Sequence, residues 1–213
     1  MKKFLAGIVL VSLLFFWGSS YVMAKDYMVD SVKLHFLLDD KWIEHEDGSK
    51  PTFSEHNSDH VMIIDVVPSP GDKFQEFSQL GDDKAMQSFA DSFIEAKKSA
   101  NKNLEVLDYK VISFAKTKAI YSENILNDGK KKGYTRSIFT VHDGKSVSIT
   151  FITLTENNFH AFKRSAMDVL NNMTFTDLNG TKEKIDLFSP SGEAKSQADI
   201  KKLSRIRTQK ALT

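Results

Sequence analysis

The stretch from Gly133 to Phe175 constrains the fold most, because it contains a strand, a tight turn, a second strand and a helix without interruption. Residues 134–141 and 146–154 alternate in polarity, and Asp143-Gly144 stands between them. An Asp-Gly pair between two such runs is a strong hairpin signal, since Gly accepts the positive φ angle of the primed turns. The sequence therefore predicts a β-hairpin followed directly by a helix.

A second pair, Asp128-Gly129, predicts another hairpin just before the first. A two-residue turn determines which residues face each other. Counting outward from this turn places Tyr121 opposite Arg136 and Glu123 opposite Tyr134, and counting from Asp143-Gly144 places Ile138 opposite Ile149 and Phe139 opposite Ser148. The meander then has one apolar face with Ala119, Ile138, Val147, Ile149 and Phe151, and a second with Ile120, Phe139, Val141, Ile152 and Leu154.

Two amphipathic helices are available to cover these two faces. The first begins at Asp82 or Asp83, a capping residue type, and runs to about Ala100. Its apolar stripe consists of Met86, Phe89, Ala90, Phe93, Ile94 and Lys97. The second opens at Thr155 to Asn158 and carries Phe159, Phe162, Ala166, Leu170 and Met173 on one side.

Three further strands precede the first helix, at residues 32–38, 52–56 and 60–67. The third is apolar on both faces, which is typical of a central strand buried on both sides. Together these elements predict an α+β fold, a three-layer α/β/α sandwich with a mostly antiparallel sheet of about six or seven strands. The connection from Pro68 to Asp82 is long for a compact domain, and we expect a short helical turn in it with Phe74, Phe77 and Leu80 over the sheet edge.

Residues 1–24 are interpreted as a secretory signal peptide. Lys2 and Lys3 precede an apolar run of 14 residues from Phe4 to Trp17, and Val22-Met23-Ala24 forms a cleavage site of the A-x-A type. Because a membrane span needs about 20 apolar residues, cleavage is expected rather than an uncleaved N-terminal anchor, which is the alternative. A short signal that begins with lysines predicts bacterial export, to the periplasm or the medium.

The length and composition of the mature chain predict a single domain at residues 25–176 and a polar, flexible tail at 177–213. Without the two signal-peptide lysines it has 27 basic and 28 acidic residues, a balance that gives no reason to expect nucleic acid as a partner. Membrane contact would require an uncleaved signal or a basic tail helix with Ile200, Leu203 and Ile206 on one side. The absence of cysteine excludes a lipidated N-terminal cysteine and disulfide bonds.

The order of the elements resembles the PsbP/Mog fold, which includes photosystem extrinsic subunits, the Ran-binding Mog protein and bacterial envelope proteins of the DcrB type. Residues 34–42 (LHFLLDDKW) are similar to the opening strand, turn and tryptophan of that group. Residues 146–151 (SVSITF) resemble its penultimate strand, and 159–175 its closing helix. Asp39-Asp40 replaces the proline usual before the tryptophan. The resemblance implies a binding or assembly role and transfers no catalytic residue.

Tyr121, Glu123, Tyr134 and Arg136 form the first candidate site, since the register places them on one face of the meander. An arginine beside aromatic walls could hold a carboxylate or phosphate with two hydrogen bonds. The alternative is a structural ion pair between Arg136 and Glu123 under the end of a helix.

His56 and His60 form the second candidate site, for a metal ion, with Glu55 and Asp59 nearby. Imidazole and carboxylate groups can bind zinc or copper. The alternative is a hairpin turn without metal, because a third ligand is not evident in the sequence. His142, next to a turn, is expected to be exposed to solvent.

No motif for a catalytic nucleophile, a phosphate-binding loop or a metalloprotease occurs in the chain, so we expect neither enzymatic activity nor a bound cofactor. The leading hypothesis is an exported, non-enzymatic envelope protein that binds another envelope protein or assists envelope assembly. The alternative is a periplasmic protein that binds a small ligand or a metal ion. A hydrolase with an unfamiliar set of carboxylates or histidines is the third possibility.

Overall fold

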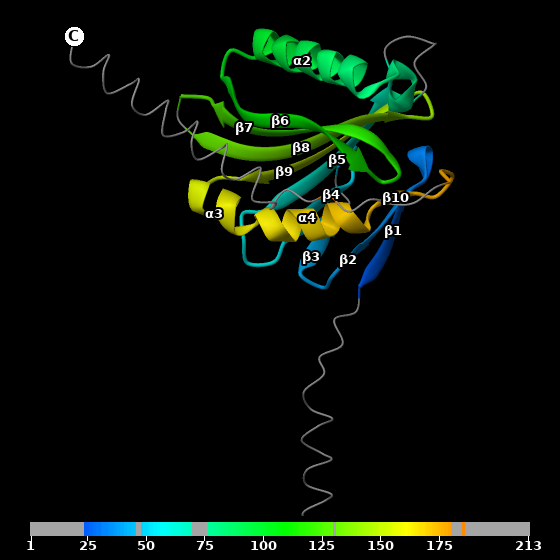
Figure 1. The fold of residues 1–213 in the computed structure, drawn as a ribbon. Helices are drawn as coiled ribbons and strands as arrows, with labels where there is room; N and C mark the ends of the chain where they lie inside the picture. The colour runs from blue at the N-terminus through cyan, green and yellow to red at the C-terminus, as the bar shows by residue number, and fades with distance from the viewer. Residues whose placement is uncertain (1–23, 46–47, 70–75, 130, 180–184, 186–213) are drawn as a thin grey trace, which may run out of the picture.

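The fold was analysed in a computed structural model, which describes residues 24–45, 48–69, 76–129, 131–179 and 185 (Figure 1). Its strands are β1 (Lys25–Val29), β2 (Leu34–Leu38), β3 (Trp42–His45), β4 (Thr52–Glu55), β5 (Val61–Pro68), β6 (Leu104–Phe114), β7 (Thr117–Asn127), β8 (Lys132–His142), β9 (Lys145–Thr153) and β10 (Thr174–Phe175). Seven of them form an antiparallel sheet in the order β3-β4-β5-β9-β8-β7-β6, and β1-β2-β10 form a small second sheet.

Helices lie on both faces of the large sheet (Figure 1). Helix α2 (Asp83–Ala100) covers one face, while α3 (Glu156–Ala161), α4 (Lys163–Asn172) and the small sheet lie on the other. Short 3-10 helices are found at η1 (Asp30–Val32) and η2 (Phe77–Leu80). The predicted α+β fold with a seven-stranded antiparallel sheet is thereby confirmed.

The helix starts follow the expected capping chemistry. The side chain of Asp82 accepts a hydrogen bond from the Ala85 backbone N–H at 2.9 Å, and Thr155 Oγ1 accepts one from the Asn158 N–H at 3.3 Å. The closing helix, which was expected to be continuous, is interrupted at Phe162, whose φ of −86° and ψ of 4° end α3 before α4 begins. The last helical segment therefore consists of two helices, α3 and α4.

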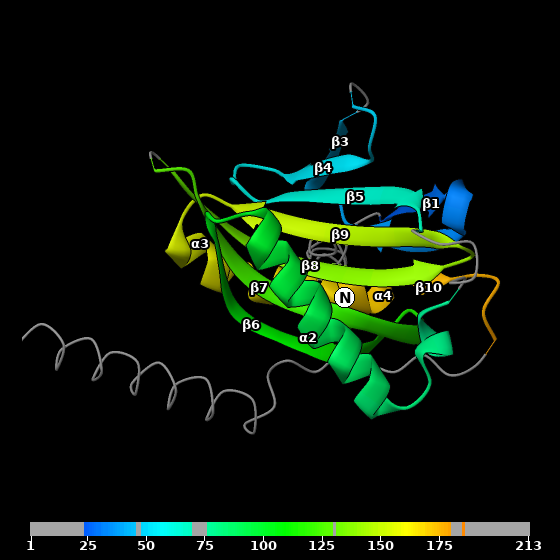
Figure 2. The same ribbon diagram turned by 90° about the horizontal axis from the view of Figure 1, so that it is seen from above.

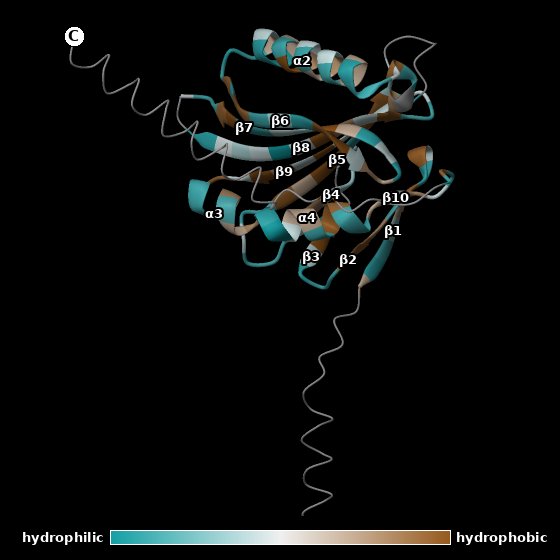
Figure 3. Ribbon diagram, viewed as in Figure 1, coloured by the Kyte–Doolittle hydropathy of each residue, from teal (hydrophilic) through white to brown (hydrophobic). Residues whose placement is uncertain are grey.

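Two hydrophobic cores lie on opposite faces of the sheet. The main core joins it to α4 and the small sheet through residues that include Phe36, Trp42, Ile138, Ile149, Phe151 and Leu170. The second joins it to α2 and η2 through Phe77, Met86, Ala90, Ile120 and Val141. Figure 3 shows hydrophobic residues concentrated on the strands between the layers and hydrophilic residues on much of α3. The expected short helical turn in the long connection is η2, with Phe77 fully buried; Phe74 lies outside the described residues.

Helix α2 covers only part of its face. It crosses β6, β7 and β8 and leaves β5, β4 and β3 to one side (Figure 2). The reason is width: one helix is about 10–12 Å across with its side chains, whereas seven strands at about 4.8 Å span roughly 30 Å. The uncovered part, here named the open half-sheet, comprises Ile43, His45, Thr52, Ser54, Val61, Ile63, Asp65, Val67, Thr150 and Ile152, together with Leu154 directly after β9.

The register of one predicted hairpin is confirmed and that of the other is corrected. Ile138 lies opposite Ile149, as the Asp143-Gly144 turn predicts. In the preceding hairpin, however, Glu123 lies opposite Arg136, and Tyr121 lies opposite Ile138. The loop contains four residues, 128–131, because Asp128 accepts a hydrogen bond through its side chain from the Lys131 backbone N–H at 2.6 Å. The shift is by two residues, so every side chain remains on its predicted face.

Both ends of the domain differ from the sequence expectation. The first strand was expected at residues 32–38, but the residues from Lys25 onward already form strand β1 against β2. At the other end packing continues beyond residue 176, since Leu178 contacts the main core and Ile185 is buried. The Ile185 N–H donates to Asn171 Oδ1 at 2.7 Å. Residues 1–23 of the expected signal peptide at 1–24 and most of the tail, Ile200 to Ile206 included, lie outside the described residues.

Within the ranges that the structure describes, no helix has both the length and the apolar character needed to cross a membrane.

Candidate functional site

The four residues of the first candidate site lie on one face of β7 and β8, as expected. Glu123 is their centre. Its Oε1 atom accepts a hydrogen bond from the Tyr121 hydroxyl at 2.5 Å and another from Arg136 Nε at 3.0 Å. Lys163 Nζ on α4 lies 3.9 Å from the same oxygen. One carboxylate therefore joins two strands of the sheet to a helix above them.

Aromatic rings close this group from the helix side. The ring of Phe159 on α3 lies over the guanidinium, with 3.7 Å between Arg136 Cζ and the ring centre. Tyr134 packs against the same ring, with 5.7 Å between the two ring centres. The stacking of a guanidinium on an aromatic face is electrostatically favourable, more so where water is excluded. These contacts hold helix α3 against the sheet.

Burial dominates the electrostatics of the group. The Arg136 side chain is 2% exposed and Glu123 is 15% exposed. Burial raises the pKa of the Tyr121 hydroxyl well above its ordinary value of 10.0, and the negative charge of Glu123 raises it further, while Arg136 opposes the change. Tyr121 is therefore a neutral hydrogen-bond donor to the carboxylate.

This geometry is that of a closed ion pair, the structural alternative considered for these residues. Glu123 already occupies Arg136 Nε, and Phe159 covers the guanidinium face. A carboxylate or phosphate ligand would have to displace one of them. One group remains unsatisfied: Arg136 Nη2 is buried and has no hydrogen-bond partner among the described residues.

The two histidines of the second candidate site have different environments. His60 is fully buried, with Nδ1 3.0 Å from Glu55 Oε2 and its ring stacked on Phe162 at 4.8 Å. His56 is exposed in the turn between β4 and β5. Among the described residues, no group of three or more His, Asp or Glu side chains is placed to hold a metal ion. His60 instead has the surroundings of a core histidine.

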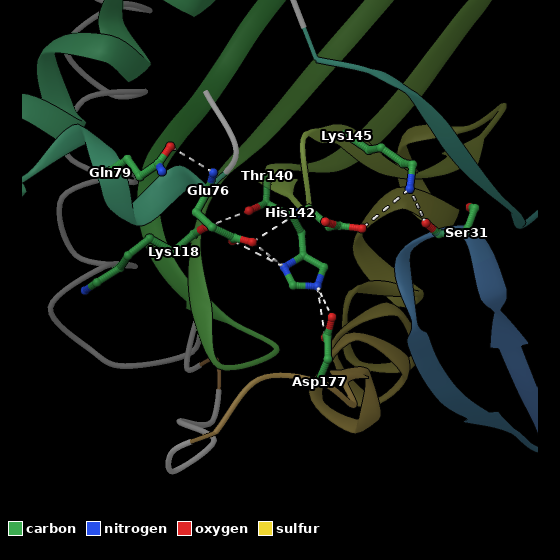
Figure 4. A network of polar contacts seen from close by, with 9 residues as sticks. Ser31, Glu76, Gln79, Lys118, Thr140, His142, Lys145 and Asp177 are labelled. Atoms are coloured by element: carbon green, nitrogen blue, oxygen red, sulfur yellow. Dashed lines mark hydrogen bonds and ion pairs between the residues drawn. The ribbon is translucent and has the colours of Figure 1, made fainter. Parts of the chain in front are cut away.

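A third polar group was missed at the level of sequence. His142, expected to be exposed, is 2% exposed and lies between two carboxylates, Glu76 and Asp177 (Figure 4). A signal for its burial was available, because strand alternation places His142 on the same face as Ile138, which belongs to the main core. No sequence pattern indicated the two carboxylates, which lie 66 and 35 positions away from it.

The open half-sheet is the candidate docking surface. The apolar residues on both faces of β5 predicted a strand buried on both sides, but only one face is buried. Met62 and Ile64 point into the main core and are fully buried, whereas Val61 and Ile63 on the opposite face are half-buried. Ile43, Val67 and Leu154 on this face are exposed by 44%, 47% and 57%.

Cross-strand pairing arranges these side chains into rows. One row runs from Ile43 through Ser54 and Val61 to Ile152, across four strands. The neighbouring row runs from His45 through Thr52 and Ile63 to Thr150.

A charged pair lies within this face, because Asp65 stands between Ile63 and Val67 on β5 and its Oδ2 atom is 2.7 Å from Lys50 Nζ. The surface therefore consists mainly of apolar and hydroxyl side chains, with His45 and the Lys50–Asp65 pair among them. Contiguous apolar surface of this kind is characteristic of protein-binding sites.

Comparison with known proteins defines the fold class. No protein-family model matches the sequence, and no curated protein does. The chain is similar in structure to the cyanobacterial PsbP protein (CyanoP) of Synechocystis, with a TM-score of 0.53 and 15% identity over 74% of this chain and 95% of that one. The protein thus has a PsbP-like α+β fold.

Two further structures are similar at a lower level. The Ran-binding protein Mog1p of Saccharomyces cerevisiae has a TM-score of 0.47 and 9% identity over 73% of this chain and 97% of its own. A protein of unknown function from Pseudomonas aeruginosa has a TM-score of 0.46 and 12% identity over 75% of this chain and 99% of its own.

Proposed function

We propose that this protein is an exported, non-enzymatic protein of the bacterial envelope, of the DcrB type, and that it binds another envelope protein through the open half-sheet. The observation that carries the proposal is the exposure of Ile43, Val67 and Leu154 on one uncovered sheet face. Half-buried Val61 and Ile152 share a cross-strand row with Ile43, and Ile63 lies in the neighbouring row, while Asp65 separates these residues from Val67. Burying such a surface against a partner would supply the hydrophobic contribution that α2 supplies over the other strands.

The N-terminal sequence supports the compartment in this proposal. A signal of the length and charge found at residues 1–24 directs export, and β1 begins at Lys25, the first residue after the expected cleavage site. Mass spectrometry of the protein from a periplasmic fraction should therefore find an N-terminus at Lys25. A chain that retains residues 1–24 in the membrane fraction would support the anchored alternative.

Site-specific photo-crosslinking in living cells tests the partner surface. A photoreactive amino acid at Ile43 or Val67 should form a discrete adduct with one partner, which mass spectrometry identifies. The control position is Ala96, which is exposed on α2. Substituting Leu154→Lys should abolish the adduct from Val67 without changing the melting temperature. Adducts of equal yield at Ala96, or none at the two open half-sheet positions, would contradict the proposal.

The second candidate function, binding of a small anion, depends on the unsatisfied Arg136 Nη2. A ligand that binds the folded state raises its melting temperature at concentrations well above the dissociation constant. Phosphate and acetate should then raise the melting temperature of the wild type more than that of Arg136→Lys. Equal shifts in both would exclude this site.

A further inference from the structure

His142 has a carboxylate on each side of its ring (Figure 4). Nδ1 lies 3.0 Å from Glu76 Oε1, and Nε2 lies 3.0 Å from Asp177 Oδ1. The ring also packs against Phe175, with 4.1 Å between the ring centres. The imidazolium form has an N–H on both nitrogens and can therefore donate to both carboxylates at once.

The two carboxylates come from segments that are distant in the chain. Glu76 stands just before η2, in the connection between β5 and α2. Asp177 stands just after β10, where the chain leaves the small sheet. One histidine at the end of β8 therefore bridges two segments that flank different cores.

Both segments also have local hydrogen bonds to backbone amides. Glu76 Oε1 accepts the Asp143 backbone N–H at 3.0 Å, and the Gln79 N–H donates to the Glu76 carbonyl at 3.0 Å. On the other side, the Thr176 N–H donates to the Lys33 carbonyl at 3.0 Å. If a carboxylate contact is lost and its segment opens, the backbone amides of that segment should exchange faster and report the opening.

The nearby lysines are engaged elsewhere. Lys145 Nζ donates to the Ser31 carbonyl at 2.6 Å and lies 3.7 Å from Asp143. Lys118 Nζ lies 3.8 Å from Asp83, and Lys116 Nζ donates to the Leu178 carbonyl at 2.7 Å. Among the described residues, His142 is thus the one ionisable group recorded in contact with the side chains of both Glu76 and Asp177.

We propose that His142 is a two-sided latch that couples the segment at residues 76–80 to the segment at residues 176–179. When one carboxylate leaves the ring, the imidazole loses one of its two hydrogen-bonded partners and is held less firmly. The contact to the other carboxylate then weakens. The fully buried Phe77, which fills the second core under α2, would then open together with the C-terminal segment. The latch is a conformational property of the fold and does not depend on the proposed function.

Amide hydrogen exchange of the full-length protein tests this coupling. In the nearly isosteric variant Asp177→Asn, the Gln79 and Asp143 amides should exchange several-fold faster, although neither contacts residue 177. In Glu76→Gln, the Thr176 and Leu178 amides should accelerate in the same way. The reason is that a hydrogen bond to a charged group contributes more than one between neutral groups, so its loss is transmitted through the shared ring.

The variant Lys116→Met is the matched control, because it removes a contact to the C-terminal segment that does not involve His142. It should accelerate exchange around Leu178 and leave Gln79 and Asp143 unchanged. If Asp177→Asn and Glu76→Gln each affect only their own segment, the two contacts are independent and the latch does not exist. If Lys116→Met accelerates both segments equally, the coupling does not run through His142.

Discussion

Arg136 and Phe159 meet with the guanidinium carbon 3.7 Å from the centre of the ring, so a charged side chain of β8 lies directly under the first turns of α3. The arginine is buried on all sides and has a carboxylate partner in Glu123. Burying one charge without its partner costs much free energy, whereas burying the two charges as a pair costs far less. This relationship makes the Tyr121, Glu123, Tyr134 and Arg136 group a determinant of stability.

The ion pair should show strong coupling in a double-mutant cycle. Arg136→Met leaves Glu123 without its main partner and should lower the free energy of unfolding by about 3 kcal/mol, near the lower end for a broken buried pair because Glu123 is 15% exposed. The double variant Arg136→Met, Glu123→Leu should lose less than the sum of the single variants. Denaturant unfolding of all four proteins provides the measurement. Additive losses would mean that the two charges do not stabilise each other.

Tyr121 should reduce stability at alkaline pH. Its pKa is raised in the folded state, mainly by burial, so above pH 10.0 the unfolded chain loses this proton while the folded chain keeps it. The unfolded state then binds fewer protons, and the free energy of unfolding falls as the pH rises. Tyr121→Phe should make this fall shallower between pH 9 and 11, measured by urea unfolding at each pH. An unchanged slope would show that another group is responsible.

His60 should behave as an aromatic core residue. Its ring stacks on Phe162 and lies 5.2 Å from the ring centre of Trp42, and its Nε2 has no partner among the described residues. His60→Phe keeps the packing and should cost less than about 1.5 kcal/mol, whereas His60→Ala leaves a cavity and should cost about 3 kcal/mol. Thermal unfolding with and without zinc is the measurement. A zinc-dependent increase in melting temperature that His60→Phe abolishes would support the metal site instead.

A lysine at position 97 should stabilise the folded state less than an apolar residue of similar length would. Burial lowers the pKa of its ammonium group, which means that the folded state disfavours the charge. Lys97→Met should therefore raise the melting temperature at pH 7, even though it removes a 5.6 Å cation–π contact with Phe93. The adjacent Lys98→Met is the control, since Lys98 pairs with Glu95 on the surface and should give no gain. Equal effects of the two substitutions would contradict this reasoning.

Local patterns predicted the elements and their faces well. The apolar faces assigned to Ile138 and Phe139 are those of the two cores. The error in the hairpin at residue 128 has a local cause, since Asp128 can close either a two-residue or a four-residue loop and its side chain stabilises the longer one. Helix α2 was recognised with its cap because the apolar stripe and the capping residue all lie within one continuous segment of the chain.

Sequence alone could not reveal the missing cover over half of the sheet. Val61, Ile63 and Ile152 are apolar, and so are their neighbours on the opposite face. Strands that are apolar on both faces are usually covered on both sides, so burial on both sides was the natural expectation. Whether one helix suffices depends on its width relative to the whole sheet and on where it crosses. The width of the sheet and the place where the helix crosses it are known only once the order of the strands in the sheet is known.

The sequence by itself determined the central strands and helix α2, the two-faced character of the meander and the hairpin at Asp143-Gly144, because each depends on residues that are neighbours in the chain. The tertiary structure decided that β1 pairs with β2, that the face of β5 with Ile63 stays open, and that Glu76 and Asp177 meet at His142. These features depend on how the complete chain packs, and Glu76 and Asp177 lie 66 and 35 positions from His142 in the chain.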